Sequence, residues 1–113
     1  MKSQIAAAPE LSLIVPTYNE GQNIARLIKR VHKSLSNYSY ELIVVDDDSP
    51  DGTSELAKRM AQEYPVRVVV RKNSRGIASA VVYGFKQAKG SWWTWGVKRR
   101  RYRQDKTTTE PSA

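Results

Sequence analysis

The stretch Leu42-Ile43-Val44-Val45-Asp46-Asp47-Asp48 decides the fold class, because four apolar residues run directly into three acids. A short, continuously apolar run that ends in polar residues is typical of a central strand in a parallel sheet. The run Leu11-Ser12-Leu13-Ile14-Val15 has the same character and leads into Pro16-Thr17-Tyr18-Asn19-Glu20. Ligands of open α/β sheets bind at the carboxyl ends of the strands, so both polar stretches are candidate binding segments.

Helical patterns separate the predicted strands. The apolar spacing predicts strands over residues 11–16, 41–46 and 66–70, and helices over residues 21–36, 54–64 and 77–89. Asn19 is the expected N-cap of the first helix, Gly90 is the expected C-cap of the third, and residues 92–95 can begin a fourth strand. Strands that alternate with helices predict a three-layer, Rossmann-like α/β fold with a parallel sheet. The predicted inward face of the third helix is Ile77, Val81, Phe85 and Ala88.

Length and charge limit the domain organisation. The chain has 113 residues, which suits one small domain or part of a larger one. It has no cysteine, which excludes a disulfide framework and a thiolate metal site. We expect an N-terminal arm over residues 1–10, one α/β domain over 11–95, and a basic, disordered tail over 96–113. Half of the net charge of +8 lies in residues 97–113, so nucleic-acid binding by the domain itself is not expected.

The common nucleotide signatures are absent. The sequence contains neither a G-x-x-x-x-G-K-[ST] loop nor a G-x-G-x-x-G turn after the first strand. There is also no Ser-His-Asp set, and His32, the single histidine, is expected to be structural or solvated. A P-loop enzyme, a dinucleotide-binding dehydrogenase and a covalent hydrolase therefore have no support.

Polar residues after the first two strands can bind a nucleoside. Tyr18 offers a flat face for a base, and Glu20 offers a carboxylate near the next helix. Asp46, Asp47 and Asp48 can accept hydrogen bonds from a base edge or a ribose, or can help to place a divalent cation. Turn formation and helix capping are the alternative roles for residues at these positions. Capping needs one acid rather than three, which favours binding for the second turn.

A basic loop follows the third predicted strand. Arg71, Lys72 and Arg75 precede Gly76 at the entry to the third helix. A diphosphate binds to cations or to helix N-terminal amides, so this loop is a candidate phosphate site. The alternative is a solvated basic loop without a ligand. Because the carboxyl ends of parallel strands share one edge of the sheet, acids for a nucleoside and cations for phosphates converge there.

The chain resembles the N-terminal part of a family 2 inverting glycosyltransferase with the GT-A fold, in the dolichol-phosphate (polyprenol-phosphate) mannosyltransferase branch. The resemblance covers residues 11–91 and rests on three ordered motifs. These are Val15–Glu20, Val45–Thr53, and a third motif that consists of Arg71, Gly76-Ile77-Ala78-Ser79-Ala80, Gly84 and the ending Ala88-Lys89-Gly90. The family pattern has Gly-Leu-Gly-x-Ala where this chain has Gly76–Ala80, and a glycine where this chain has Asp48.

The resemblance implies site residues and ligands. Pro16, Tyr18 and Glu20 would line the nucleotide pocket, Asp47 and its neighbour Asp46 would contact the base or the ribose, and Arg71 would lie near the diphosphate. Asp48 is a candidate nucleotide-binding residue because it belongs to the run of three acids after the second strand, not because of the resemblance. The donor would be GDP-mannose or a UDP-sugar, and the acceptor a lipid-linked phosphate at a membrane face. A divalent cation, Mg²⁺ or Mn²⁺, would assist the leaving nucleoside diphosphate. The implied location is cytoplasmic or peripheral at the cytoplasmic membrane face.

One expected motif is missing after residue 90. The family has an Asp-x-Asp motif for the cation there, whereas residues 91–113 contain a single aspartate, Asp105. No catalytic residue is identified, and the main cation ligands are missing. We therefore interpret the chain as a truncated, inactive member of the family.

Other interpretations stay open at this point. The chain could be a nucleotide-binding fragment without turnover, or its basic tail could bind nucleic acid or anionic lipid while the α/β part serves as a scaffold. A receiver-like domain would explain the acids after the second strand, but the Pro16–Glu20 turn argues against it.

Overall fold

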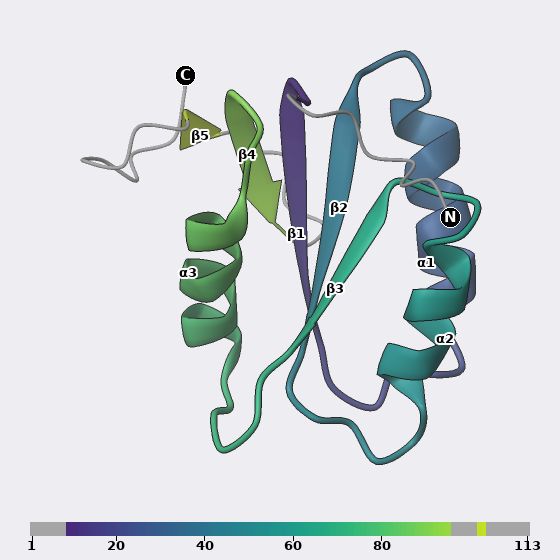
Figure 1. Ribbon diagram of the computed structural model, residues 1–113, viewed down its shortest axis with the longest axis vertical. Helices are drawn as coiled ribbons and strands as arrows, with labels where there is room; N and C mark the ends of the chain where they lie inside the picture. Colours follow the sequence, from purple (N-terminus) through teal and green to yellow (C-terminus); the bar gives the residue numbers. More distant parts are fainter. Residues whose placement is uncertain (1–8, 96–101, 104–113) are drawn as a thin grey trace.

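The computed structural model describes residues 9–95 and 102–103, which form one twisted sheet with helices on both faces (Figure 1). The strand order is β3-β2-β1-β4-β5; β1 to β4 are parallel, and β5 is antiparallel to β4. The parallel α/β fold predicted from the sequence is confirmed. The elements are β1 (Leu11–Thr17), α1 (Ile24–Leu35), β2 (Tyr40–Asp46), α2 (Thr53–Met60), β3 (Val66–Val70), α3 (Ile77–Gln87), β4 (Trp92–Trp95) and β5 (Tyr102–Arg103).

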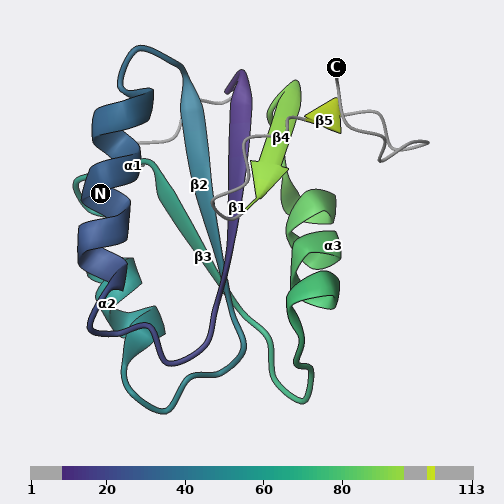
Figure 2. The ribbon, with the colours of Figure 1, turned by 180° about the vertical axis from the view of Figure 1, so that it is seen from behind.

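The central strands are buried on both faces, which explains their continuous apolar runs. Leu42 and Val44 of β2 pack beneath α1 and α2, whereas Ile43 and Val45 face α3. Figures 1 and 2 show α1 and α2 on one side of the sheet and α3 on the other. Alternating side chains of one strand therefore belong to two separate cores. Because β1, β2 and β3 run parallel, the three loops that follow them lie at the same edge of the sheet.

The start of α1 corrects one prediction. Asn19 is not the N-cap of the first helix; it has a left-handed φ of 56°, and the N-cap position is Asn23. The amides that precede the helix are bound by another loop instead. Asn19 N donates to Ser49 Oγ at 2.8 Å, and Gly21 N donates to Asp51 Oδ2 at 3.0 Å. The turn after β1 is therefore held by the turn after β2 rather than by helix capping.

The ends of α3 correct two further predictions. Gly90 is not the C-cap, which is Ala88; Gly90 N donates to Ser12 Oγ at 2.8 Å. A Cβ at Gly90 would lie 2.8 Å from the backbone of Leu11 and Ser12, so the glycine permits close backbone approach. The apolar spacing predicts Ile77 on the same helical face as Val81 and Phe85, but Ile77 is 64% exposed, because the buried residues of α3 begin only at Ala80.

The region after residue 95 is described only at β5. Tyr102 and Arg103 pair with Trp93 and Trp92, so at these two residues the chain is a strand rather than part of a disordered tail. The rest of the predicted tail, residues 96–101 and 104–113, and the first eight residues of the predicted arm lie outside the described residues. Across residues 9–95 and 102–103, no helix is long and apolar enough to cross a lipid bilayer.

A buried polar network joins the strands at their amino ends. Glu41 is fully buried and accepts hydrogen bonds from Ser12 Oγ at 2.6 Å, Arg67 Nη2 at 2.8 Å and Lys89 N at 2.7 Å. Arg67 Nη2 also donates to the carbonyl oxygen of Gln87 at 2.6 Å. One carboxylate thus ties β1, β2 and β3 to the end of α3, at the edge opposite the predicted site.

We expect the stability of the fold to fall between about pH 10 and about pH 12 because of Tyr40. Burial, with a smaller contribution from Tyr64, raises the pKa of Tyr40 from 10.0 to about 12. Since the folded-state pKa is the higher one, this contribution is complete below the unfolded pKa and is lost as the pH rises through the folded pKa. The loss is at most about 1.4 kcal/mol per pH unit.

Denaturant unfolding of the wild type and of Tyr40→Phe across this pH range measures the effect. The difference in unfolding free energy between the two proteins should shrink with rising pH. Tyr40 Oη also lies 2.8 Å from His32 Nδ1, so the variant should be less stable at neutral pH as well. A difference that stays constant up to pH 12 would contradict the assignment.

Candidate functional site

The turns after β1 and β2 form one connected structure at the carboxyl edge of the sheet. Glu20 N donates to Thr53 Oγ1 at 3.0 Å, in addition to the two amide contacts described above. Asp51 Oδ1 accepts from the amide and the hydroxyl of Thr53. The Thr53 hydroxyl, followed by the Gly21 amide, holds the pKa of the exposed Asp51 below its usual value. Asp51 and Ser49 therefore serve the turn, which was the alternative role for residues of this loop.

Asp46 is buried and fixes the end of β1 to the loop after β2. Its Oδ1 accepts from Thr17 Oγ1 at 2.7 Å and from Ser49 Oγ at 2.6 Å, and its Oδ2 accepts from Ser49 N at 2.9 Å. The side chain has no exposed surface. In this conformation the carboxylate is used by protein donors, so its contribution is to shape the turn.

Asp47 is also buried, and it forms a bidentate ion pair with Arg71. Arg71 Nε donates to Asp47 Oδ1 at 2.7 Å, and Arg71 Nη2 donates to Asp47 Oδ2 at 2.9 Å. Gly76 N donates to the same Oδ2 at 3.1 Å. The pair joins the end of β2 to the segment after β3 and to the start of α3.

The exposed polar and aromatic side chains of the site include one aromatic ring, one cation and two acids. Tyr18 is 37% exposed, and the guanidinium carbon of Arg75 lies 4.2 Å from the centroid of its ring. Stacking of a cation on an aromatic face is weakly favourable at exposed sites. Glu20 and Asp48 are exposed, and Asp48 has a left-handed φ of 55°. These groups can reach a ligand without breaking a buried contact.

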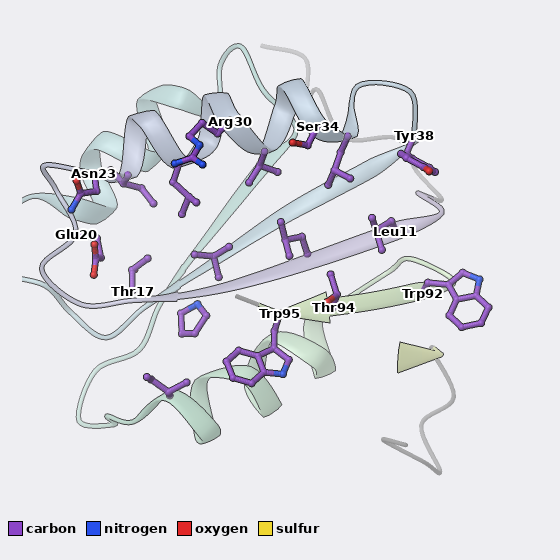
Figure 3. A pocket seen from close by; sticks show the side chains of 18 of the residues that line it. Leu11, Thr17, Glu20, Asn23, Arg30, Ser34, Tyr38, Trp92, Thr94 and Trp95 are labelled. Atoms are coloured by element: carbon purple, nitrogen blue, oxygen red, sulfur yellow. The ribbon is translucent and has the colours of Figure 1, made fainter. Parts of the chain in front are cut away.

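Two hollows meet at this edge. A small cavity of about 260 Å³ lies between the turn after β1 and the start of α3. A larger groove of about 1080 Å³ runs along β1 between α1 and β4, with Glu20 and Thr17 at one end and Tyr38 and Trp92 at the other (Figure 3). The two hollows share Pro16, Thr17, Glu20 and Ile77. The small cavity is lined by Pro16, Thr17, Tyr18, Glu20, Asp47, Arg75, Gly76 and Ile77.

The small cavity brings together four of the seven predicted site residues, namely Pro16, Tyr18, Glu20 and Asp47. Asp46 and Arg71 lie behind it in the protein interior, and Asp48 is exposed outside it. Thr17 and Ile77 were missed. Thr17 lies in the predicted turn after the first strand, but its small hydroxyl side chain gave no signal of ligand binding; Ile77 fits the apolar period of the third helix, which favoured a core position.

The described residues do not form a metal site. Within residues 9–95 and 102–103, no group of three histidine, cysteine or acidic side chains lies close enough to hold a metal ion. Asp46 and Asp47, the acids best placed by sequence, accept from Thr17, Ser49, Arg71 and Gly76 instead.

A parallel sheet with helices on both faces and a polar crevice at the carboxyl ends defines a Rossmann-like α/β domain. Within that class, the chain belongs to glycosyl transferase family 2, whose family model matches residues 12–95. The recognition made from the three sequence motifs is thereby confirmed.

Similar proteins include mannosyltransferases. The dolichol-phosphate mannosyltransferase of Pyrococcus furiosus is 47% identical over 81 residues, which are 72% of this chain and 23% of that protein. The Saccharomyces cerevisiae protein of the same name is 46% identical over 87 residues, covering 74% of this chain and 33% of its own length. The mannosyltransferase PcManGT from Pyrobaculum calidifontis, in complex with GDP-Man and Mn²⁺, matches with a TM-score of 0.64 at 29% identity, over 82% of this chain and 29% of that chain.

The chain matches only one part of each of these relatives. The chain spans about a quarter to a third of their length. The comparison therefore establishes the fold and the family of the matched part, and it does not extend to the activity of a whole enzyme.

Proposed function

We propose that this chain binds the nucleotide of a sugar-nucleotide donor and forms the donor-binding part of a mannosyltransferase that acts on a polyprenol or dolichol phosphate. The observation that carries the proposal is the small cavity, where Tyr18, Glu20, Asp47 and Arg75 converge at the carboxyl edge of the sheet. The names of the similar proteins support mannose and the lipid phosphate, and GDP-Man in the related PcManGT complex supports guanine over uracil.

The residues of the cavity suit a nucleoside. The face of Tyr18 stacks on the base, and the Glu20 carboxylate accepts hydrogen bonds from a base edge or a ribose hydroxyl. The exposed cation of Arg75 attracts the negative charge of the phosphates. The larger groove continues from the cavity past Glu20, and it offers space for the rest of the donor.

The reaction we propose is a displacement at the anomeric carbon. An oxygen of the lipid phosphate forms a bond to the anomeric carbon of mannose, the bond from that carbon to the nucleoside diphosphate breaks, and GDP leaves with the bonding electron pair. The family relationship supports Mg²⁺ or Mn²⁺ as the partner of the leaving diphosphate. Because the acceptor is anchored in a bilayer by its isoprenoid chain, the proposed reaction takes place at a membrane surface. The family resemblance alone is the reason for proposing the cytoplasmic face.

Calorimetric titration with GDP and with UDP, each with and without Mn²⁺, tests the proposal. We expect the wild type to bind GDP measurably. In Tyr18→Ala the free energy of GDP binding should be less favourable by about 1–3 kcal/mol, the usual contribution of stacking between a base and an aromatic side chain.

Tyr83→Ala is the matched control, because Tyr83 is 39% exposed, close to the 37% of Tyr18, but lines neither hollow. This variant should bind GDP like the wild type. Folded protein that binds neither nucleotide would remove the proposed site, and equal losses in the two tyrosine variants would place binding elsewhere.

A further inference from the structure

All three guanidinium nitrogens of Arg71 contact protein acceptors. Nε and Nη2 form the bidentate pair with Asp47, Nη2 also lies 3.3 Å from the carbonyl oxygen of Gly76, and Nη1 donates to Ser79 Oγ at 3.1 Å. The residue is 9% exposed and does not line the small cavity. Reaching a bound diphosphate would require the guanidinium to leave Asp47, which would then be a buried carboxylate without its cation.

The contacts of Arg71 and Asp47 converge on Gly76. Asp47 Oδ2 accepts from the amide of Gly76, and Arg71 Nη2 donates to its carbonyl oxygen. Gly76 has a φ of 124°, a conformation that other residues rarely adopt, and it is the N-cap residue of α3. The ion pair therefore fixes both polar backbone groups of the residue where the loop after β3 becomes a helix.

The position of Gly76 determines the wall of the small cavity. Its chain neighbours Arg75 and Ile77 line that cavity together with Gly76 and Asp47, and Arg75 lies over the ring of Tyr18. Without the hydrogen bonds that hold the backbone of Gly76, its neighbours Arg75 and Ile77 would also shift. A preformed wall lowers the entropy cost of binding any ligand in the cavity, whether or not that ligand carries phosphates.

We infer that Arg71 is a positioning residue, which holds Asp47 and the Gly76 turn in place so that the nucleoside cavity is preformed, and that it is not a ligand of the diphosphate. The inference rests on the proposed function, since it assigns a role within the same site. It differs from the role that the family resemblance implies for Arg71, and the two roles make opposite predictions for a ligand without phosphates.

Guanosine and GDP separate the two roles. If Arg71 positions the cavity, Arg71→Met should weaken guanosine and GDP by the same factor, about tenfold or more, the usual effect of losing a charge-assisted hydrogen bond. Arg71→Lys keeps the charge but not the planar fork, so it should also weaken both ligands equally. If Arg71 binds the diphosphate, GDP alone should weaken in Arg71→Met, and Arg71→Lys should retain much of the affinity for GDP. NMR titration at a temperature where every variant is folded measures both ligands.

Amide hydrogen exchange tests the same inference without a ligand. The Gly76 amide should exchange faster in both Arg71 variants, while the amides of Ile43 and Val44 in the core of β2 keep their protection. Lys86→Met is the control, because Lys86 is an exposed cation on α3 that lines neither hollow and lies outside the candidate phosphate loop. It should change neither the exchange of Gly76 nor the affinity for guanosine.

The possible failures are distinguishable. Wild-type protein that binds neither guanosine nor GDP contradicts the proposed function, and the exchange of Gly76 still decides whether Arg71 holds the turn. Unchanged Gly76 exchange together with unchanged guanosine affinity in Arg71→Lys overturns the inference, as does a loss confined to GDP. If Arg71→Met does not fold, the Arg71→Lys variant carries the test, because its retained charge still compensates Asp47.

Discussion

Replacement of Glu41 with alanine is expected to lower the free energy of unfolding by about 3–5 kcal/mol, the usual cost of removing one partner from a buried ion pair. Three donors lose their acceptor at once, namely the Ser12 hydroxyl, the Arg67 guanidinium and the Lys89 amide. A domain of this size has a total stability of about 5–15 kcal/mol, so the variant should be partly unfolded in mild denaturant. Urea unfolding followed by circular dichroism measures the change.

The control for this prediction is Glu63→Ala, which removes an exposed carboxylate. It should change stability by no more than about 0.5 kcal/mol, as surface substitutions usually do. Equal stability of Glu41→Ala and Glu63→Ala would contradict the stabilising role of the hydrogen-bond network around Glu41. This network lies at the edge opposite the candidate site. Glu41→Ala should therefore lower nucleotide binding only through the fraction of unfolded protein, and the folded fraction should bind with unchanged affinity.

Replacement of Gly84 with valine is expected to destabilise the domain by about 3 kcal/mol through overpacking of the core. A Cβ at this position would lie 2.5 Å from Cγ2 of Ile14 and 3.3 Å from Cγ2 of Val45. Ile14 and Val45 are fully buried, so neither has free space to move into. Either α3 must move away from the sheet or β1 and β2 must shift.

Ala78→Val provides the matched control, because it introduces the same side chain at an exposed position of α3. It should stay within about 0.5 kcal/mol of the wild type in the same unfolding experiment. A similar loss in both variants would mean that the helix propensity of valine, rather than the contact with Ile14, determines the result.

The fold could be predicted because strands that are buried on both faces have continuously apolar sequences. The strands β1 and β2 contain the apolar runs 13–15 and 42–45, and the turn residues after them mark the edge where the site lies. The helical period located α1, α2 and α3 but not all of their ends: the helices predicted over residues 21–36 and 54–64 are Ile24–Leu35 and Thr53–Met60. Asn19 was misassigned because its amide is bound by Ser49, thirty residues further along the chain. Local pattern carries no information about such a contact.

The inner arrangement of the site was beyond prediction for a related reason. The sequence places Asp46 and Asp47 side by side after one strand, yet their carboxylates bind different partners, Thr17 and Ser49 for one and Arg71 for the other. Which acid faces a ligand depends on the direction of each side chain. The orientation of each side chain depends on how the three loops pack together, and residues far apart in the sequence make these loop contacts.

The most direct test of the account is to map GDP onto the folded chain by NMR. The claim is that the nucleotide lies at the carboxyl edge of the sheet, between the turn after β1 and the start of α3. We predict shifts for the backbone amides of Tyr18, Glu20, Asp47 and Gly76 on addition of GDP, with no change at Ser12, Glu41 and Lys89 at the opposite edge. Shifts confined to the amino edge, or no shifts at millimolar GDP, would contradict the assignment of this chain as the nucleotide-binding part of a glycosyltransferase.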